Sequence, residues 1–221
     1  MQRPWCVGNN VVFPACLILP EQAAELNKGE FLVVPQLFPR TQRYIVPGVK
    51  EETLAVMTSA EQKVITTVDA LGVPYELIAI DPAYAETAAF CQQYDYPLER
   101  SANTIVVASK KEPKQFAVCV VLATMQLDVN RRVRKLLGVP KASFATAEEM
   151  IALTGMQVGG VTPFALPAEL PLYVDERIMR LDWIILGSGG RAAKIKIAPE
   201  VFTKLGATII ADLGLERSTP S

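Results

Sequence analysis

The sequence predicts a mixed α/β fold of the α+β kind, built on a partly antiparallel sheet. Two apolar runs rich in β-branched residues, 103–108 and 116–123, have the composition of buried strands, and the polar segment 110–114 between them suits a hairpin connection. Helical periods stand on both sides of this pair, and they do not alternate strictly with single strands. This order favours a mixed sheet with flanking helices over a doubly wound parallel sheet.

The first predicted helix begins after Thr58. Glu61 follows Thr58 by three residues, which is the spacing of a capping box, and Gly72 ends the apolar period that follows. Met57 directly precedes the cap. We therefore expect the folded domain to begin at Met57. Residues 1–56 are punctuated by prolines and carry no sustained helical period, so we expect an N-terminal extension, poorly ordered or a mis-assigned start.

The other elements follow in chain order. Four further strands are predicted at residues 73–80, 172–178, 183–186 and 193–197. Helices are predicted at residues 85–94 and 127–137, and a short one begins near residue 198. A second capping box, Thr146 with Glu149, opens a helix that ends at Thr154 and Gly155. The tail is expected to begin at residue 216.

Composition limits the function. A chain of 221 residues, 50% hydrophobic and 20% charged, can form one sizeable core. A net charge of −1 and a pI near 5.7 argue against broad nucleic-acid binding, although a local basic patch could still recognise one RNA end. No apolar run approaches the ~20 residues of a membrane-spanning helix. The run 11–19, interrupted by Pro14, makes a poor signal peptide. We expect neither a membrane nor DNA as a partner.

The four cysteines show neither C-x-x-C pairing nor the spacing of zinc ligands, so we expect free thiols in a reducing cytoplasm. The chain has no histidine, which excludes Ser-His-Asp and Cys-His catalysis and most zinc sites. We therefore expect no metal and no cofactor. Chemistry here must use backbone groups, carboxylates, lysines, hydroxyls or the substrate itself.

Two glycine clusters are the candidate site. Gly159 and Gly160 precede Val161, Thr162 and Pro163, and a second cluster spans Gly187 to Arg191. Glycines allow positive φ and close approach of a ligand or another backbone. The second cluster lacks the G-x-G-x-x-G spacing and precedes a strand, so a dinucleotide fingerprint fails, and no Walker lysine is present. We predict that the two loops converge around one cleft.

Other polar residues have two interpretations each. The basic face from Arg131 to Lys135 could contact a nucleic-acid backbone, although a solvated helix face is more common. Lys194 and Lys196 share one face of their strand, in a binding or a structural role. Asp175 either forms a turn or anchors the glycine loops by accepting backbone N–H bonds.

Taken together, these motifs resemble the YbaK family, which is similar to the editing insertion domain of bacterial prolyl-tRNA synthetases. The resemblance covers residues 57–215. It rests on the segments 101–107 (SANTIVV), 153–155 (LTG), 159–164 (GGVTPF), 172–175 (LYVD) and 187–191 (GSGGR). It implies a largely antiparallel, partly barrel-like sheet flanked by helices.

The resemblance also implies an aminoacyl-tRNA deacylase that acts in trans on the acceptor end of misacylated tRNA, with an aminoacyl-tRNA synthetase as a second candidate partner. In the family, a ribose hydroxyl next to the ester can assist the attacking water, which requires no histidine. Asn103 and Gly160 are the implied catalytic residues. The implied substrate-binding residues are Thr154, Gly155, Gly159, Val161, Thr162, Pro163, Asp175, Gly189, Gly190, Arg191 and Lys194.

The chain departs from the family pattern at one position. Asn103 stands where the family usually has a catalytic lysine, and its amide cannot supply a cation. Three outcomes follow: a deacylase with altered specificity, a deacylase that uses Lys194 or Lys196 in its place, or a binding module for aminoacyl-tRNA or a synthetase that has lost catalysis. We favour retained but altered editing. A site for an aminoacyl-like ligand unrelated to tRNA is the third class of function.

Overall fold

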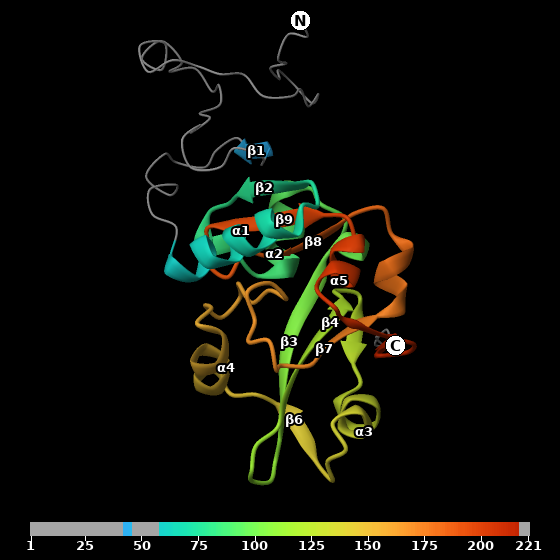
Figure 1. The fold of residues 1–221 in the computed structure, drawn as a ribbon. Helices are drawn as coiled ribbons and strands as arrows, with labels where there is room; N and C mark the ends of the chain where they lie inside the picture. Colours follow the sequence, from blue (N-terminus) through green and yellow to red (C-terminus); the bar gives the residue numbers. More distant parts are fainter. Residues whose placement is uncertain (1–41, 46–57, 217–221) are drawn as a thin grey trace, which may run out of the picture.

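The computed structural model describes residues 42–45 and 58–216, which form a mixed α/β fold with open sheets (Figure 1). Five of the eight strand pairings are antiparallel, so the largely antiparallel character is confirmed. None of the described strands closes a sheet into a barrel. Apart from strand β1 (Gln42–Ile45), the predicted extension lies outside the described residues.

The upper sheet in Figure 1 has the order β1-β2-β9-β8. It consists of β1, β2 (Tyr75–Ala79), β9 (Ala193–Ile197) and β8 (Ile184–Gly187). β1 pairs with β2 in parallel, and the other pairs are antiparallel. Helices α1 (Ser59–Leu71) and α2 (Thr87–Tyr94) cover opposite faces, because α1 packs with Leu77 and Ile195 while α2 packs with Ile78 and Ile185.

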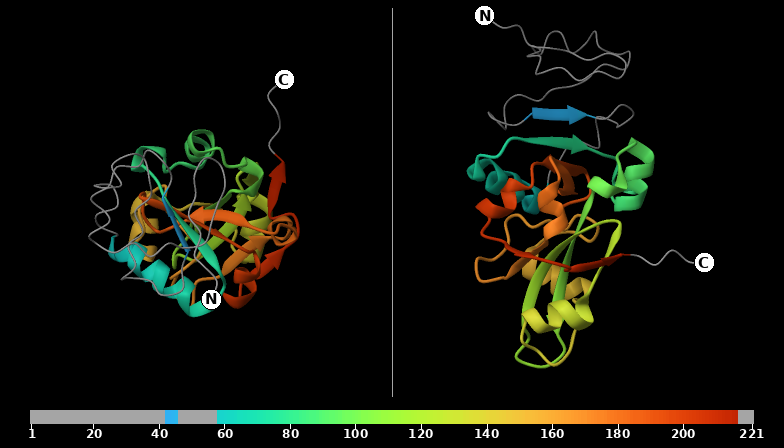
Figure 2. Two further views of the ribbon diagram at one scale, coloured as in Figure 1. Left: turned by 90° about the horizontal axis from the view of Figure 1, so that it is seen from above. Right: turned by 90° about the vertical axis from the view of Figure 1, so that its right-hand side faces the viewer.

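The lower sheet has the order β10-β7-β4-β3-β6. Its strands are β10 (Thr208–Ile210), β7 (Leu172–Asp175), β4 (Phe116–Leu122), β3 (Ala102–Ser109) and β6 (Ala142–Phe144). The predicted hairpin is confirmed, since β3 and β4 pair antiparallel along their length. In the side view of Figure 2 these strands run across the direction of the upper sheet. A third, two-stranded sheet joins β5 (Met125–Leu127) to β11 (Gly214–Glu216).

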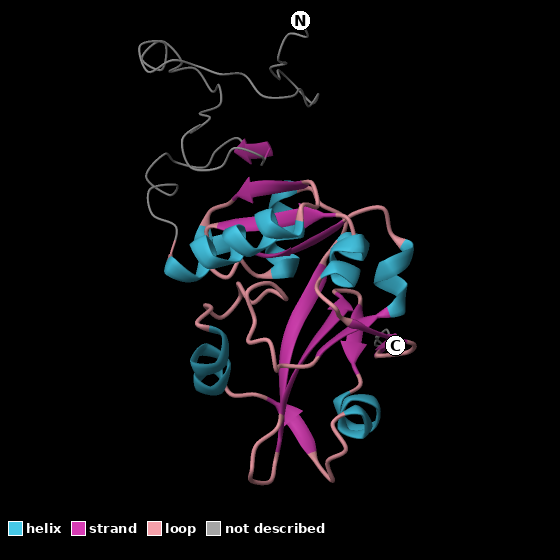
Figure 3. Cartoon of the chain, in the orientation of Figure 1, coloured by secondary structure: helices cyan, strands magenta, loops and turns pink. Residues whose placement is uncertain are grey.

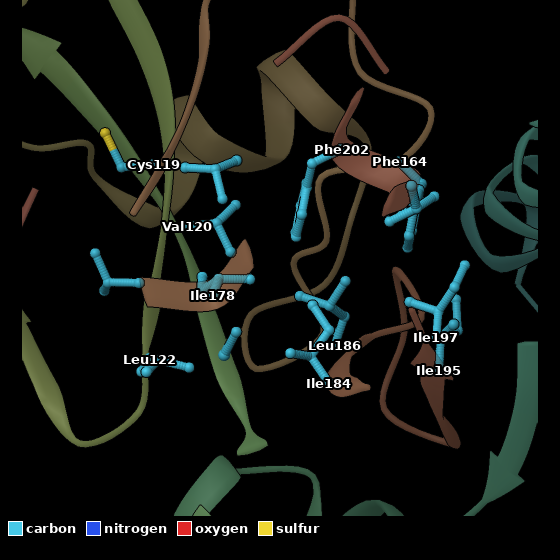
Figure 4. Close-up of a cluster of buried hydrophobic side chains, with 14 of the residues drawn as sticks. Cys119, Val120, Leu122, Phe164, Ile178, Ile184, Leu186, Ile195, Ile197 and Phe202 are labelled. Atoms are coloured by element: carbon cyan, nitrogen blue, oxygen red, sulfur yellow. The ribbon is translucent and has the colours of Figure 1, made fainter. Parts of the chain in front are cut away.

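The two larger sheets meet where β3 begins. Ser101, directly before β3, forms a parallel bridge with Ile185 in β8. Beneath this seam lies the main core, in which both sheets and the C-terminal helix α5 (Glu200–Lys204) contribute fully buried side chains such as Val120, Ile195 and Phe202 (Figure 4). Burial of a large aliphatic or aromatic side chain stabilises a fold by roughly 1.5–3 kcal/mol, so this core fixes the two sheets against each other.

Both predicted capping boxes are present. The Thr58 hydroxyl accepts from the N–H of Glu61, and Thr146 does the same for Glu149 at the start of α4 (Ala147–Thr154). Gly72 and Gly155 end α1 and α4 in the left-handed conformation. Among the described residues, no helix has the length and apolarity needed to cross a membrane. Cys91 and Cys119 carry free thiols.

The prediction of one helix over residues 127–137 was wrong. Leu127 instead pairs with Gly214 and ends β5, and a π-helical turn, Val129–Val133, follows before the short helix α3 (Arg134–Leu136). The π turn is closed by the N–H of Val133, which donates to the carbonyl of Asp128 (3.0 Å). The basic side chains of this segment are largely exposed, as a solvated face requires.

The other departures are shorter. The strand predicted at 172–178 ends at Asp175, whose side chain accepts from the N–H of Arg177 and opens a 3-10 turn, Glu176–Arg180. Two more such turns, Pro82–Tyr84 and Leu98–Arg100, flank α2. Strands β5, β6, β10 and β11 were not predicted. Each is three residues long and is defined by its partner strand.

Candidate functional site

The two glycine loops contact each other directly, so their predicted convergence is confirmed. The N–H of Gly189 donates to the carbonyl of Gly160 (2.7 Å), and the N–H of Gln157 donates to the carbonyl of Gly189 (3.0 Å). Gln157 and Gly160 lie between α4 and β7, and Gly189 lies between β8 and β9. Figure 3 draws both segments as loop. A β-carbon on Gly160 would overlap the carbonyl of Gly190, and one on Gly187 would overlap that of Gly160. Close backbone packing therefore requires glycine here.

A buried carboxylate contacts the second glycine loop. Glu61 is 1% exposed, and one of its oxygens accepts from the N–H of Thr58 in the capping box. Its other oxygen lies 3.2 Å from the hydroxyl of Ser188, which also donates to the carbonyl of Ala193 (2.9 Å). A side chain on Gly190 would overlap this carboxylate. The start of α1 thus fixes the position of the loop 187–191.

Arg191 forms hydrogen bonds with three separate segments of the chain. Its Nη1 donates to the carbonyl of Val158 (3.0 Å) and to Glu86 Oε1 (3.1 Å), and its Nη2 donates to the carbonyl of Pro82 (3.0 Å). The planar guanidinium can hold several acceptors in fixed directions. It therefore sets the spacing between the first glycine loop and the start of α2.

A cavity of about 300 Å³ opens beside the converging loops. Its walls come from the start of β3, from α2, from β8 and from β9, which places it at the seam of the two sheets. The lining residues are Glu86, Thr87, Phe90, Ser101, Ala102, Asn103, Thr104, Ile105, Gly159, Val161, Ile185, Leu186, Gly187 and Lys194. The cavity is therefore the place where the predicted site residues from three separate segments meet.

Asn103 lies on one wall of this cavity and is half-buried. The hydroxyl of Thr87, at the first turn of α2, donates to its Oδ1 (2.8 Å). This bond fixes the orientation of the amide, so that Nδ2 is left to donate to a ligand. The side chain can therefore bind a carbonyl or a hydroxyl oxygen.

Lys194, in β9, also lines the cavity and is 5% exposed. Its Nζ donates to the carbonyl of Ala85 (2.5 Å) and lies 5.7 Å from the ring centroid of Phe90. Burial lowers the pKa of Lys194 to about 8, and the charge of Glu86 acts in the opposite direction. A lysine in this state can release or take up a proton near neutral pH.

Other predicted site residues lie outside the cavity. The hydroxyl of Thr154 donates to Met150 and accepts from the N–H of Met156, and Gly155 is the C-cap of α4. Thr162 and Pro163, at the end of the first glycine loop, are buried. No described residue forms a hydrogen bond with the Thr162 hydroxyl. Gly160, Gly189, Gly190 and Arg191 shape the loops but do not line the cavity.

Two expectations are corrected by the structure. Asp175 does not anchor the glycine loops, because its fully buried carboxylate accepts from the backbone of Arg177 and of Gly214. It is the turn-former of the two alternatives. Lys196 shares a strand face with Lys194 but not its cavity, since it pairs with Glu76 (3.2 Å) and lies over Trp183 (4.8 Å).

The cavity contains further polar residues that sequence reasoning did not identify. Glu86, Thr87, Ser101 and Thr104 line it, with Glu86 exposed, Thr87 and Thr104 half-buried and Ser101 buried. Ser101 is 1% exposed and lies 3.2 Å from the thiol of Cys91, while the Thr104 hydroxyl has no partner within residues 58–216. Ser101 and Thr104 are marked in the sequence only by their proximity to Asn103, and Glu86 and Thr87 carry no signal at all, because the packing of α2 and β8 beside the start of β3 is not a local feature.

A family model described as aminoacyl-tRNA editing domain matches residues 81–205. A candidate Cys-tRNA(Pro)/Cys-tRNA(Cys) deacylase, EbsC of Enterococcus faecalis, is 28% identical over 101 residues, which cover 46% of this chain and 59% of EbsC. A proline--tRNA ligase of Burkholderia multivorans is 25% identical over 108 residues, covering 48% of this chain and 19% of the ligase. This chain thus matches about three fifths of the first relative and a fifth of the second.

The fold has solved counterparts. A crystal structure of a candidate trans-editing enzyme for prolyl tRNA synthetase superposes with a TM-score of 0.61, at 20% identity, over 74% of this chain and 100% of the other. The superposed share of the chain is larger than the segment 81–205 that the family model matches.

Proposed function

Because this chain belongs to the aminoacyl-tRNA editing domain family, we propose that it is a deacylase that acts in trans on misacylated tRNA. The reaction is hydrolysis of the ester between a wrong amino acid and the terminal adenosine. The observation that carries the proposal is the cavity at the seam, where the first glycine loop meets Asn103 and Lys194. The proposed partners are the acceptor end of the tRNA and a synthetase, and the proposed place is the cytoplasm.

The cavity offers donors suited to an ester carbonyl. Gly159 and Val161 line it, and the N–H of neither residue donates a hydrogen bond within the described part of the chain. Fixed backbone donors stabilise the oxyanion of acyl transfer without reorganising during the reaction. The Asn103 amide, held by Thr87, adds a side-chain donor to the same cavity. These groups would hold the carbonyl in place while water attacks.

In the proposed step, water adds to the carbonyl carbon of the ester and the carbonyl oxygen becomes the oxyanion. Collapse of this intermediate breaks the bond to the ribose oxygen, which takes the proton that the water lost. The neighbouring ribose hydroxyl relays that proton, since the chain offers no imidazole. Most of the rate enhancement would then come from positioning and electrostatic stabilisation.

The decisive experiment is a deacylation assay of the full chain across a panel of tRNAs charged with non-cognate amino acids. Asn103→Ala removes the amide from the cavity, while Asn130→Ala, at an exposed position of the π turn, is the matched control. We expect hydrolysis by the wild type, a loss of roughly a hundredfold or more with Asn103→Ala, in line with the cost of one lost oxyanion donor, and no change with Asn130→Ala.

Other outcomes assign other functions. Binding of charged tRNA without turnover on any member of the panel would contradict the proposal and identify a binding module. That alternative is favoured by one observation, the neutral Asn103 side chain, which supplies no cation to the reaction. If neither charged nor uncharged tRNA binds, a small aminoacyl-like ligand becomes the candidate.

A further inference from the structure

Lys194 is a buried cation without a carboxylate partner. Its ammonium carries three N–H donors, and among the described residues only the carbonyl of Ala85 accepts a hydrogen bond from it. No carboxylate within the described ranges lies within 4.0 Å of its Nζ. Burial of a charge is costly unless other groups compensate it. The other N–H donors of Lys194 have no acceptor among the described residues, and a bound ligand could supply one.

Other polar groups in the lining of the same cavity point to the same need. Ser101 lines the cavity at 1% exposure, and the buried hydroxyl of Thr104 has no protein partner in residues 58–216. Phe90 and Ile185 supply the apolar part of this inner region. The inner cavity thus combines a hydrocarbon wall with hydrogen-bonding groups that an all-apolar ligand would leave unsatisfied.

Burial also sets the direction in which a substrate enters. The residues at the mouth are at least partly exposed, with the Glu86 side chain 64% exposed and Asn103 and Gly159 half-buried. A tRNA is too large for a cavity of about 300 Å³, so the ester must stay near the mouth. The side chain of the amino acid is then the part that reaches Lys194.

We propose that Lys194 selects, at the site of the proposed deacylation, aminoacyl groups whose short side chain carries an oxygen atom. The ammonium donates to that oxygen. A hydrocarbon side chain of equal size fills the same space but leaves the donors of Lys194 without an acceptor. This inference rests on the proposed function and adds a substrate class to it.

The test uses two ligands of nearly equal shape, threonine and valine, which differ by a hydroxyl in place of a methyl. Each is attached by a stable amide to 3′-amino-3′-deoxyadenosine, and binding is measured by calorimetry; hydrolysis is measured on tRNA charged with each amino acid. The wild type is expected to prefer the threonyl ligand by roughly tenfold to hundredfold, the range of a hydrogen bond to a charged group.

Lys194→Met keeps the length of the side chain and removes its donors, so the preference is expected to fall to about one. Lys196→Met is the matched control, because Lys196 is on the same strand face but pairs with Glu76 outside the cavity. Lys194→Gln keeps a neutral donor and serves if the methionine variant does not fold; its preference should lie between the two. Thermal unfolding of each variant reports on folding.

The outcomes separate this inference from the proposed function. Hydrolysis or binding without a preference for threonine, or equal weakening of both ligands by the Lys194 variants, would overturn the inference and assign Lys194 a structural role at Ala85. If no misacylated tRNA is hydrolysed but the amide ligands show the preference, the proposed function fails and the side-chain selection stands. If neither ligand binds and no tRNA is hydrolysed, both fail.

Discussion

The carbonyl oxygen of Gly190 occupies the space that a side chain on Gly160 would need. This contact joins the two glycine loops, and it means that Gly160 acts through packing. Gly160→Ala is therefore expected to destabilise the protein by about 3 kcal/mol, since an added methyl in a packed site forces a backbone shift.

Gly155→Ala is the comparison for that variant. Gly155 has a φ of 70°, but nothing lies within 4 Å of the added β-carbon, so only the backbone conformation is strained, at a cost of about 1 kcal/mol. Urea denaturation followed by circular dichroism measures both. Equal losses for the two variants would contradict the packing argument.

Glu61→Ala is expected to cost about 2–3 kcal/mol, because it removes a buried carboxylate that serves both the cap of α1 and Ser188. Glu149→Ala removes the corresponding residue of the second capping box, which does not line the cavity, and should cost about 1 kcal/mol. Denaturation gives the two losses. The proposed deacylation should fall with the first variant and stay unchanged with the second.

Asp175→Ala is expected to destabilise by about 3 kcal/mol or more without changing the activity of the folded fraction. The substitution leaves the N–H of Gly214 and the guanidinium of Arg177 without their buried acceptor. Asp212→Ala removes the exposed partner of the same arginine and should cost less than about 1 kcal/mol. If the fully folded variant lost specific activity, Asp175 would have the substrate-binding role that the sequence analysis gave it.

The pKa of Lys194 makes stability depend on pH at the alkaline end. The folded protein binds this proton less tightly, with a pKa of about 8 against 10.5 for a free lysine. Between these values the unfolded chain holds more protons, so the free energy of unfolding rises with pH. Below pH 8 both states are protonated and the penalty of the buried charge is fully present.

Relative to Lys194→Met, the wild type should therefore gain about 3 kcal/mol of stability between pH 8 and 10.5, from 1.36 kcal/mol for each pKa unit. The difference between the two proteins cancels the titration of other groups. Denaturation at several pH values measures it, and a constant difference over this window would show that the Lys194 pKa is not lowered.

Local chemistry was readable from the sequence. Thr58 and Thr146 were predicted as helix caps because a hydroxyl and a carboxylate three residues apart satisfy each other within one turn. The β3 and β4 strands were predicted because continuous apolar runs rich in β-branched residues are typical of buried strands. Leu127 was placed in a helix because its partner Gly214 is far away in the chain, and no local pattern reports such pairing.

The candidate site divides in the same way. Glycines at 159, 160, 187, 189 and 190 predicted a close backbone approach, and the structure brings the two loops together. The contribution of α2 was not predicted, because Thr87 reaches Asn103 only through the packing of that helix on the upper sheet. Asp175 has the same residue type as a binding carboxylate, and only its contacts with Arg177 and Gly214 reveal a structural role.

The bridge between Ser101 and Ile185 has a consequence for how the protein can be divided. Asn103 and Lys194 belong to different sheets, and a cut between β7 and β8 places them in different fragments, so each fragment retains a single wall of the recess. Complementation of two such fragments would restore both walls only where the sheets re-associate. Recovered ligand binding in a split version of the chain would thus report directly on docking of the halves.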